Sequence, residues 1–206
     1  MATQPTLRPG PSVRTGMLAA SVAIAVTMCA MAVAAQRQVP VAAKRDDPAI
    51  AGFLDRVNAY LALHQRLEST TPKLPGGATP KQIDDRQRAL AALIQAARAE
   101  EAKRGDVFTP RMAAFAKDLL NRVFAGPDGQ QLLSSIMDEN PVDIQLKINQ
   151  RYPSDVPFAT MPPDVLRALP ELPEELEYRF IGDDLILLDP HAHIIVDFIP
   201  DALPGR

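Results

Sequence analysis

The amino-acid sequence predicts an α+β protein, in which a bundle of about four helices is followed by a small, mostly antiparallel sheet. Two changes in pattern support this class. Between residues 47 and 140, apolar side chains recur every three or four residues, which is the period of an amphipathic helix. From residue 141 to residue 206 that period is lost, and short apolar runs between turn residues indicate strands instead.

The first 35 residues predict the helix of a secretory signal peptide. Residues 1–16 carry two arginines and no acid, residues 17–35 carry no charge, and Ala32-Val33-Ala34 fits the small-residue site that signal peptidase cleaves. The alternative is an uncleaved anchor, because 19 uncharged residues approach the length of a membrane-spanning helix. Both interpretations predict export: a periplasmic or secreted protein after cleavage, or a protein whose membrane contact is confined to residues 17–35.

The composition of the chain after residue 35 excludes several partners and catalytic classes. It holds 20 Lys and Arg against 25 Asp and Glu, and this formal charge of −5 argues against a nucleic-acid partner. Cys29, the single cysteine, lies in the leader, so the mature chain has no intramolecular disulfide and no cysteine nucleophile. No serine has a nucleophile-elbow context and no phosphate-binding glycine loop is present. The fold must therefore rely on its apolar core.

The first helix is predicted to start after a flexible linker of residues 36–46. Asp47 is a good N-cap, Pro48 suits the first helical position, and the helix is expected to end near Ser69. His64 lies on the apolar stripe of this helix. Its ring is expected at the edge of the core with one nitrogen satisfied. The alternative role is a general base, because histidine titrates near neutral pH.

Two further helices carry the same start signal. Thr79-Pro80 begins the second helix with a capping box, and Gly105 is expected to end it. Thr109-Pro110 begins the third, which Gly126 is expected to close. An apolar stripe over residues 132–137 indicates a shorter fourth helix. Because all four stripes need cover, the helices are expected to pack against one another.

A strand and a proline-rich strap are expected next. Val142–Asn149 alternates strictly between apolar and polar side chains, as a half-buried strand does. Six prolines lie between Pro153 and Pro173, and they prevent long regular elements. The strap is expected to lie over the surface, with one short helical turn at residues 162–169.

The C-terminus predicts a three-stranded antiparallel meander. Gly182-Asp183 suits the tight turn between the first two strands. The middle strand is apolar on both faces, as is typical of a central strand. The expected strands are Glu177–Ile181, Asp184–Asp189 and His193–Ile199. In the third strand, the residues expected to share one face are Ile194, Val196 and Phe198.

One segment of the chain resembles a known family. Residues 161–200, MPPDVLRALPELPEELEYRFIGDDLILLDPHAHIIVDFIP, resemble the C-terminal module of a group of uncharacterised exported bacterial proteins. In that group a proline-rich strap leads to a similar hairpin. The resemblance covers about a fifth of the chain. It implies export and a small C-terminal sheet, and it implies no activity.

The loop before the last strand holds the candidate site residues Asp189, His191 and His193. Histidines two residues apart in an extended chain have α-carbons about 6.5 Å apart and rings on one face, so they could chelate one ion together with Asp189. Zn, Cu or Ni would suit such ligands. The favoured interpretation is an exposed hairpin tip, because Asp and Pro favour turns and the loop contains few side chains that could bind a metal ion.

These observations predict a non-catalytic interaction or accessory protein of the bacterial cell envelope, acting through a protein partner and without a cofactor. The prediction rests on the lack of a catalytic motif in the sequence. The first alternative is a periplasmic metal-binding protein that uses the loop around His191. The second is a two-carboxylate hydrolase of envelope polymers, although adjacent acids such as Asp84-Asp85 are typical of a solvated surface.

Overall fold

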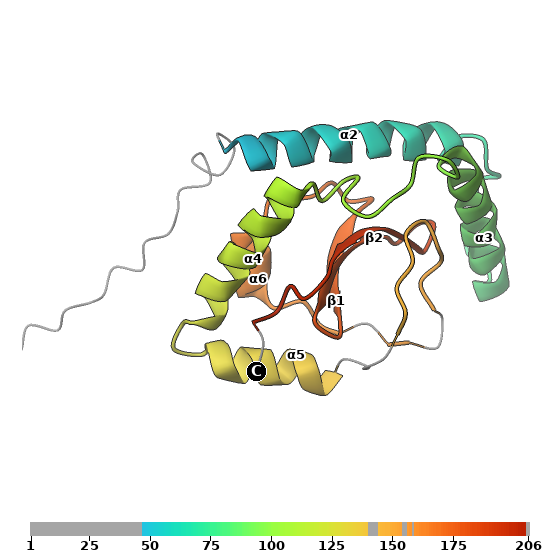
Figure 1. Cartoon of the computed structure of the whole chain (residues 1–206). Helices are drawn as coiled ribbons and strands as arrows, with labels where there is room; N and C mark the ends of the chain where they lie inside the picture. Colours follow the sequence, from blue (N-terminus) through green and yellow to red (C-terminus); the bar gives the residue numbers. More distant parts are fainter. Residues whose placement is uncertain (1–46, 140–143, 154–155, 158, 205–206) are drawn as a thin grey trace, which may run out of the picture. The chain divides into compact units, whose positions relative to one another are not determined.

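The computed structural model describes residues 47–139, 144–153, 156–157 and 159–204 (Figure 1). Residues 1–46 lie outside this range, so the signal peptide, the anchor and the linker stay predictions. Within the described ranges, no helix combines the length and the apolar character needed to cross a membrane. The described elements are helices and a small antiparallel sheet, which confirms the predicted α+β class.

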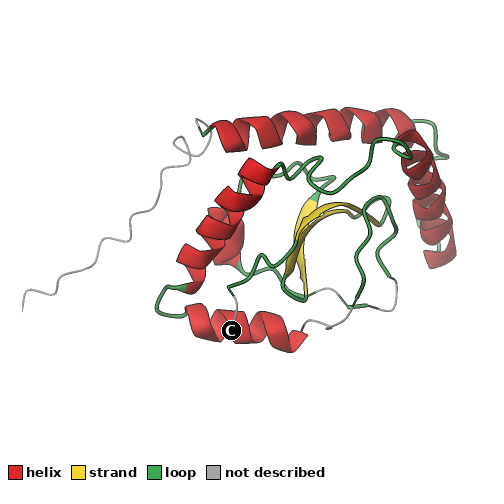
Figure 2. Ribbon diagram, in the orientation of Figure 1, coloured by secondary structure: helices red, strands yellow, loops and turns green. Residues whose placement is uncertain are grey.

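Four of the described helices follow one another between residues 48 and 139, and a fifth, short helix lies further along the chain, in the strap. α2 contacts α3 and α4, and α4 contacts α5 and α6. Figure 2 shows these helices arranged around the strands, with which they share one core. The described helices are α2 (Pro48–Glu68), α3 (Pro80–Ala97), α4 (Pro110–Phe124), α5 (Gly129–Glu139) and α6 (Pro163–Ala168).

The three predicted helix starts are confirmed by their capping bonds. The side chain of Asp47 accepts from the backbone N–H of Ala49 at 2.7 Å. Thr79 forms the capping box with Gln82, and Thr109 accepts from the backbone of Met112. Each side chain satisfies a backbone donor that has no partner within its helix.

The predicted end of the second helix is wrong. α3 ends at Ala97, well before Gly105, and Arg98 is its C-cap. The guanidinium of Arg98 reaches across to the carbonyl of Val196, at 3.3 and 3.4 Å. Gly105, with φ of +85°, belongs instead to a loop that closes over Asp197. The residue at the end of this helix is therefore held to the sheet by a long-range polar contact.

The sheet is the predicted meander, with the strand order β1 (Glu177–Ile181), β2 (Asp184–Asp189) and β3 (Ile194–Ile199). Gly182, with φ of +53°, supplies the left-handed residue that a two-residue hairpin turn requires. One face of β2 packs into the helical core, and its other face joins a smaller apolar cluster. The buried residues of that cluster are Tyr152, Ile181, Ile186, Leu188 and Ile195.

A β-bulge in β3 changes which side chains face the core. Leu187 is opposite Asp197 and Leu188 is opposite Ile195, so Val196 is an extra residue in its strand. Ile194 and Val196 both lie in the main core, as predicted. Phe198 packs against the smaller cluster on the other face, so its predicted side is wrong. One inserted residue reverses the alternation beyond it.

The predicted strand Val142–Asn149 is also wrong over its described part. Residues 144–147 form no regular element, and Asn149 has a positive φ of 61°. The alternation instead directs Ile144 and Leu146 against the smaller cluster. Backbone pairing to β3 begins at Asn149, whose N–H donates to the carbonyl of Ile195 at 2.9 Å. The chain thus covers the edge of β3 through an isolated bridge at Arg151.

The strap is part of the core as well as a surface cover. Met161, Val165 and Leu169 are buried in the same cluster as Phe53 of α2 and Leu185 of β2. The short helical turn is confirmed as α6. The hydroxyl of Tyr178 on β1 donates to the carbonyl of Pro170 at 3.0 Å, which fixes the strap against the sheet. Helices, strap and sheet are therefore held by one continuous apolar core.

Replacing Asp197 with alanine tests the anchor of the 105–108 loop. This fully buried carboxylate accepts from the backbone N–H groups of Gly105, Val107 and Phe108 at 2.7–3.1 Å, and from that of Phe198. The variant leaves these donors buried without an acceptor, so we expect the free energy of unfolding in urea to fall by about 3 kcal/mol or more.

The control for that change is Asp118→Ala, which breaks an exposed ion pair with Arg122 on α4. It should change the free energy of unfolding by less than about 0.5 kcal/mol. Equal effects of the two substitutions would show that the buried carboxylate does not anchor the loop.

Candidate metal centre

Three polar residues follow one another at four-residue steps along α2. Tyr60, His64 and Glu68 therefore lie on the same side of this helix, one turn apart. Tyr60 and His64 are buried, whereas Glu68 near the C-terminal end keeps 25% of its side chain exposed. The row leads from the core to the surface, and each member finds a partner on another element.

Asp189, the last residue of β2, is the buried partner of this row. Its carboxylate is fully buried and accepts from the hydroxyl of Tyr60 at 2.7 Å. The same oxygen lies 2.6 Å from Nδ1 of His64, and the other accepts from the backbone N–H of Ala192 at 2.9 Å. Since the carboxylate can only accept when ionised, Nδ1 of His64 carries a proton. The other ring nitrogen, Nε2, faces Glu68.

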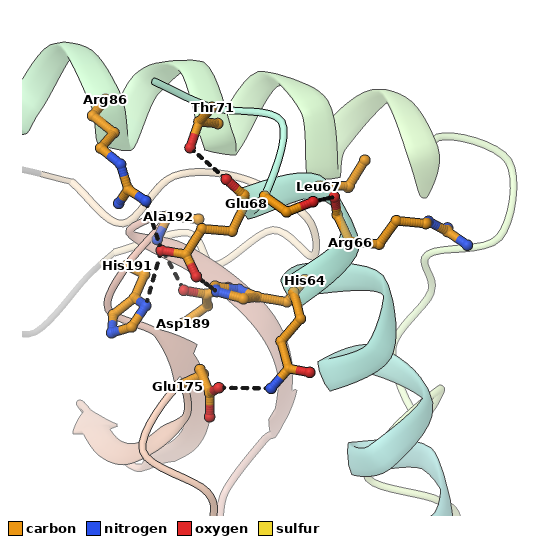
Figure 3. Close-up of polar contacts among 12 residues, drawn as sticks. His64, Arg66, Leu67, Glu68, Thr71, Arg86, Glu175, Asp189, His191 and Ala192 are labelled. Carbon is orange, nitrogen blue, oxygen red and sulfur yellow. Dashed lines mark hydrogen bonds and ion pairs between the residues drawn. The ribbon is translucent and has the colours of Figure 1, made fainter. Parts of the chain in front are cut away.

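His64 lies between two carboxylates (Figure 3). Nε2 is 3.2 Å from Oε2 of Glu68, so both ring nitrogens face an oxygen. Burial lowers the pKa of His64, but the hydrogen bond and charge of Asp189, with those of Glu68, outweigh it and raise the pKa above its ordinary value. Tyr60 is held neutral, because burial and the neighbouring Asp189 carboxylate raise its pKa well above the usual range.

Glu68 is shared by two cationic or potentially cationic groups besides His64. The guanidinium of Arg86, on α3, donates to Oε1 at 3.0 Å. Nδ1 of His191 lies 3.6 Å from the same oxygen. Burial raises the pKa of Glu68, but the hydrogen bond from Arg86 and the charges of His64, His191 and Arg86 outweigh this effect. The pKa is therefore below its ordinary value, and the carboxyl group is ionised at neutral pH.

His191 is placed by the loop between β2 and β3. The bond from Ala192 to Asp189 tightens this loop, and Gln87 of α3 donates to the carbonyl of Pro190 at 3.1 Å. The ring of His191 comes within 5.5 Å of the His64 ring, measured between centroids. Its side chain is 41% exposed, yet its Nδ1 atom is buried and has no hydrogen-bond partner among the described residues. That nitrogen is available to a ligand.

The donor atoms of His64, Glu68 and His191 all lie within 4.8 Å of one another. In the part of the chain that the structure describes, this is the one group of three or more His, Cys, Asp or Glu side chains that could hold a metal ion. Ligands about 2.0–2.2 Å from a tetrahedral ion are about 3.4 Å apart. Oε2 of Glu68 lies 3.2 Å from Nε2 of His64, and Oε1 lies 3.6 Å from Nδ1 of His191. Each histidine is therefore at about the right distance from one oxygen of this carboxylate.

The contacts behind His64 match the outer shell of protein metal sites. A metal-binding histidine usually donates its other ring N–H to a carboxylate, which fixes the tautomer and the ring orientation. Asp189 has this role for His64, and Tyr60 in turn orients Asp189. A ligand at Nε2 would replace a proton between His64 and Glu68, and would thus meet a ring that is already oriented.

The structure brings together only part of the predicted set Asp189, His191 and His193. Asp189 and His191 belong to the cluster, but Asp189 stands behind His64 and does not converge with the donor atoms. His193, at a positive φ of 57°, turns its ring against Tyr152, 5.6 Å away. Burial, followed by the charge of Arg151, lowers the pKa of His193. The two histidines of the motif therefore have different surroundings.

Two members of the cluster, His64 and Glu68, were not predicted as ligands from the sequence. A partial signal was present, because histidine and glutamate four residues apart on a helix lie on one side of it. Comparison of the chain with protein-family models, with curated proteins and with solved structures found no match. Only the contacts of these residues indicate a metal centre.

The raised pKa of His64 predicts a pH-dependent stability in buffer that contains a chelator. The folded state binds the His64 proton more tightly than the unfolded state does. The stabilisation that this proton contributes is fully present below the ordinary histidine pKa, and it is lost as the pH rises through the pKa of His64 in the folded protein. We expect the free energy of unfolding of the wild-type protein to fall as the pH rises above about 6.5, the ordinary histidine pKa.

The control for the pH series is His64→Gln, in which His191, His193 and the acidic neighbours remain. Its free energy of unfolding should fall less with pH over the same range, as measured by urea titration at each pH. A slope equal to that of the wild type would show that the buried imidazole is not the titrating group.

Proposed function

We propose that this chain is an exported accessory protein of the cell envelope that binds a transition-metal ion. The ligands are Nε2 of His64, the carboxylate of Glu68 and Nδ1 of His191. One observation carries the proposal: these donors converge within 4.8 Å, while Asp189 holds the far nitrogen of His64. The predicted loop is kept as part of the site, but His64 and Glu68 replace Asp189 and His193 as ligands.

The ligand types favour particular metals. Two imidazole nitrogens and one carboxylate suit Zn²⁺, Cu²⁺ and Ni²⁺, whereas Ca²⁺ and Mg²⁺ prefer oxygen donors throughout. The sequence offers no cysteine outside the leader, so a thiolate site is not available after cleavage. Zn²⁺ is the principal candidate because three donors with one further position fit its tetrahedral coordination.

The same contacts favour binding over hydrolysis by two carboxylates. A hydrolase of that kind needs two acids on either side of the bond to be cleaved, with the substrate between them. Glu68 and Asp189 are the acids of this cluster, and the ring of His64 fills the space between them with a bond on each side. Binding of an ion therefore agrees better with this arrangement than hydrolysis does.

The proposal of export rests on the leader in residues 1–35. It can be tested by determining the first residue of the protein recovered from its native host. Cleavage by signal peptidase after the Ala32-Val33-Ala34 site is expected, because the preceding run is uncharged and rich in alanine. Mass spectrometry should therefore find a chain that starts at Ala35 or Gln36. A chain that retains residues 17–35 would favour the anchor instead.

Zinc titration of the purified protein tests the ligand set. Calorimetry should give one zinc ion per chain for the wild type. Replacing a residue that only orients a metal ligand costs roughly 10–100-fold in affinity. His191→Ala should weaken zinc binding by more than this, because it removes a ligand itself.

His193→Ala is the matched control in the same motif, since its ring lies against Tyr152. It should leave the affinity for zinc unchanged within about twofold. Equal loss in the two variants would support the ligand set predicted from the sequence, and no saturable binding to the wild type would remove the proposal.

A further inference from the structure

A positive side chain already occupies the carboxylate that a metal ion would use. Nη2 of Arg86 lies 3.0 Å from Oε1 of Glu68, and Nδ1 of His191 approaches the same oxygen. Figure 3 shows the side chains of Arg86 and His191 reaching Glu68 from different elements. A metal ion bound between His191 and this oxygen would lie close to the guanidinium of Arg86. The two positive charges would repel each other, because charges in a partly buried site are only weakly screened.

Arg86 has the means to leave Glu68. It lies on α3, and its side chain is 23% exposed. Its Nε atom donates to the carbonyl of Pro72 at 3.2 Å, in the loop before α3, so a second polar partner lies within reach. Arginine has a long side chain whose head can move into water while the stem stays packed. Withdrawal of the guanidinium would expose the Glu68 oxygen to an incoming ion.

The helix that carries Arg86 also holds the loop that carries His191. Gln87, the next residue of α3, donates to the carbonyl of Pro190. α3 therefore positions one metal ligand and one competitor for another ligand. A movement of α3 near Arg86 and Gln87 would therefore affect both Glu68 and the loop that carries His191.

Resting on the proposed function, we infer that Arg86 competes with the metal ion for Glu68 and keeps binding reversible. The protein then exchanges its ion, as a metal-delivery or metal-buffering protein must, whereas a permanent structural ion needs no internal competitor. No proton is transferred in this exchange: the guanidinium stays protonated, leaves the carboxylate for water, and keeps its Nε bond to the carbonyl of Pro72.

The first test compares zinc affinities of Arg86→Gln and Arg88→Gln in the purified full chain. Glutamine removes the competing charge at Arg86, so the affinity for zinc should rise about tenfold or more. Arg88 lies on the same helix, but it pairs with Asp84 at 2.7 Å and is 61% exposed, so its variant should bind zinc as the wild type does. An unchanged or weaker affinity in Arg86→Gln contradicts the inference.

The second test uses the wild-type protein alone and remains decisive if Arg86→Gln does not fold. Zinc at saturation should increase the modification of Arg86 by phenylglyoxal, measured by peptide mass spectrometry, and leave that of Arg88 unchanged. Unchanged or reduced modification of Arg86 in a protein that binds zinc overturns the competition and leaves the metal site standing. Failure of every variant and of the wild type to bind zinc overturns the site itself.

Discussion

The carboxylate of Asp189 is the constraint on which this structure depends. It ends the central strand, is fully buried, and accepts bonds from α2 through Tyr60 and His64 and from its own loop through Ala192. A buried carboxylate without such donors would cost several kcal/mol. α2 must therefore lie over the end of β2 in one rotation and at one height, because only that placement brings two donors to the same oxygen.

A second buried carboxylate acts in the same way on the neighbouring strand, β3. Asp197 follows the extra residue of the β3 bulge and gathers the backbone N–H groups of the loop between α3 and α4. Arg98, at the end of α3, bonds the carbonyl of Val196 and lies over the ring of Tyr60, 5.2 Å from its centroid. The apolar core binds helices to the sheet, while these polar contacts select one arrangement among many with similar apolar burial.

The elements that could be predicted from the sequence are those fixed by neighbours in the chain. Asp47, Thr79 and Thr109 cap their helices by bonds to residues two or three positions away, and Gly182 closes its hairpin by its own conformation. The site depends on partners far apart: Asp189 lies 125 residues from His64. No periodicity marks such a pair, so the buried histidine was predicted with one partner instead of two. The contact between His64 and Glu68 spans only one helical turn, so the sequence pattern alone could have indicated it.

The metal centre extends this buried network to the surface, since the row that begins at Tyr60 ends at Glu68 and His191. The most direct measurement is an anomalous difference map, collected at the zinc absorption edge, from crystals of the zinc-loaded protein. We expect one peak about 2.0–2.2 Å from Nε2 of His64, a carboxylate oxygen of Glu68 and Nδ1 of His191, with Asp189 still bonded to His64. A peak at His193, or zinc bound only to scattered surface side chains, would contradict it.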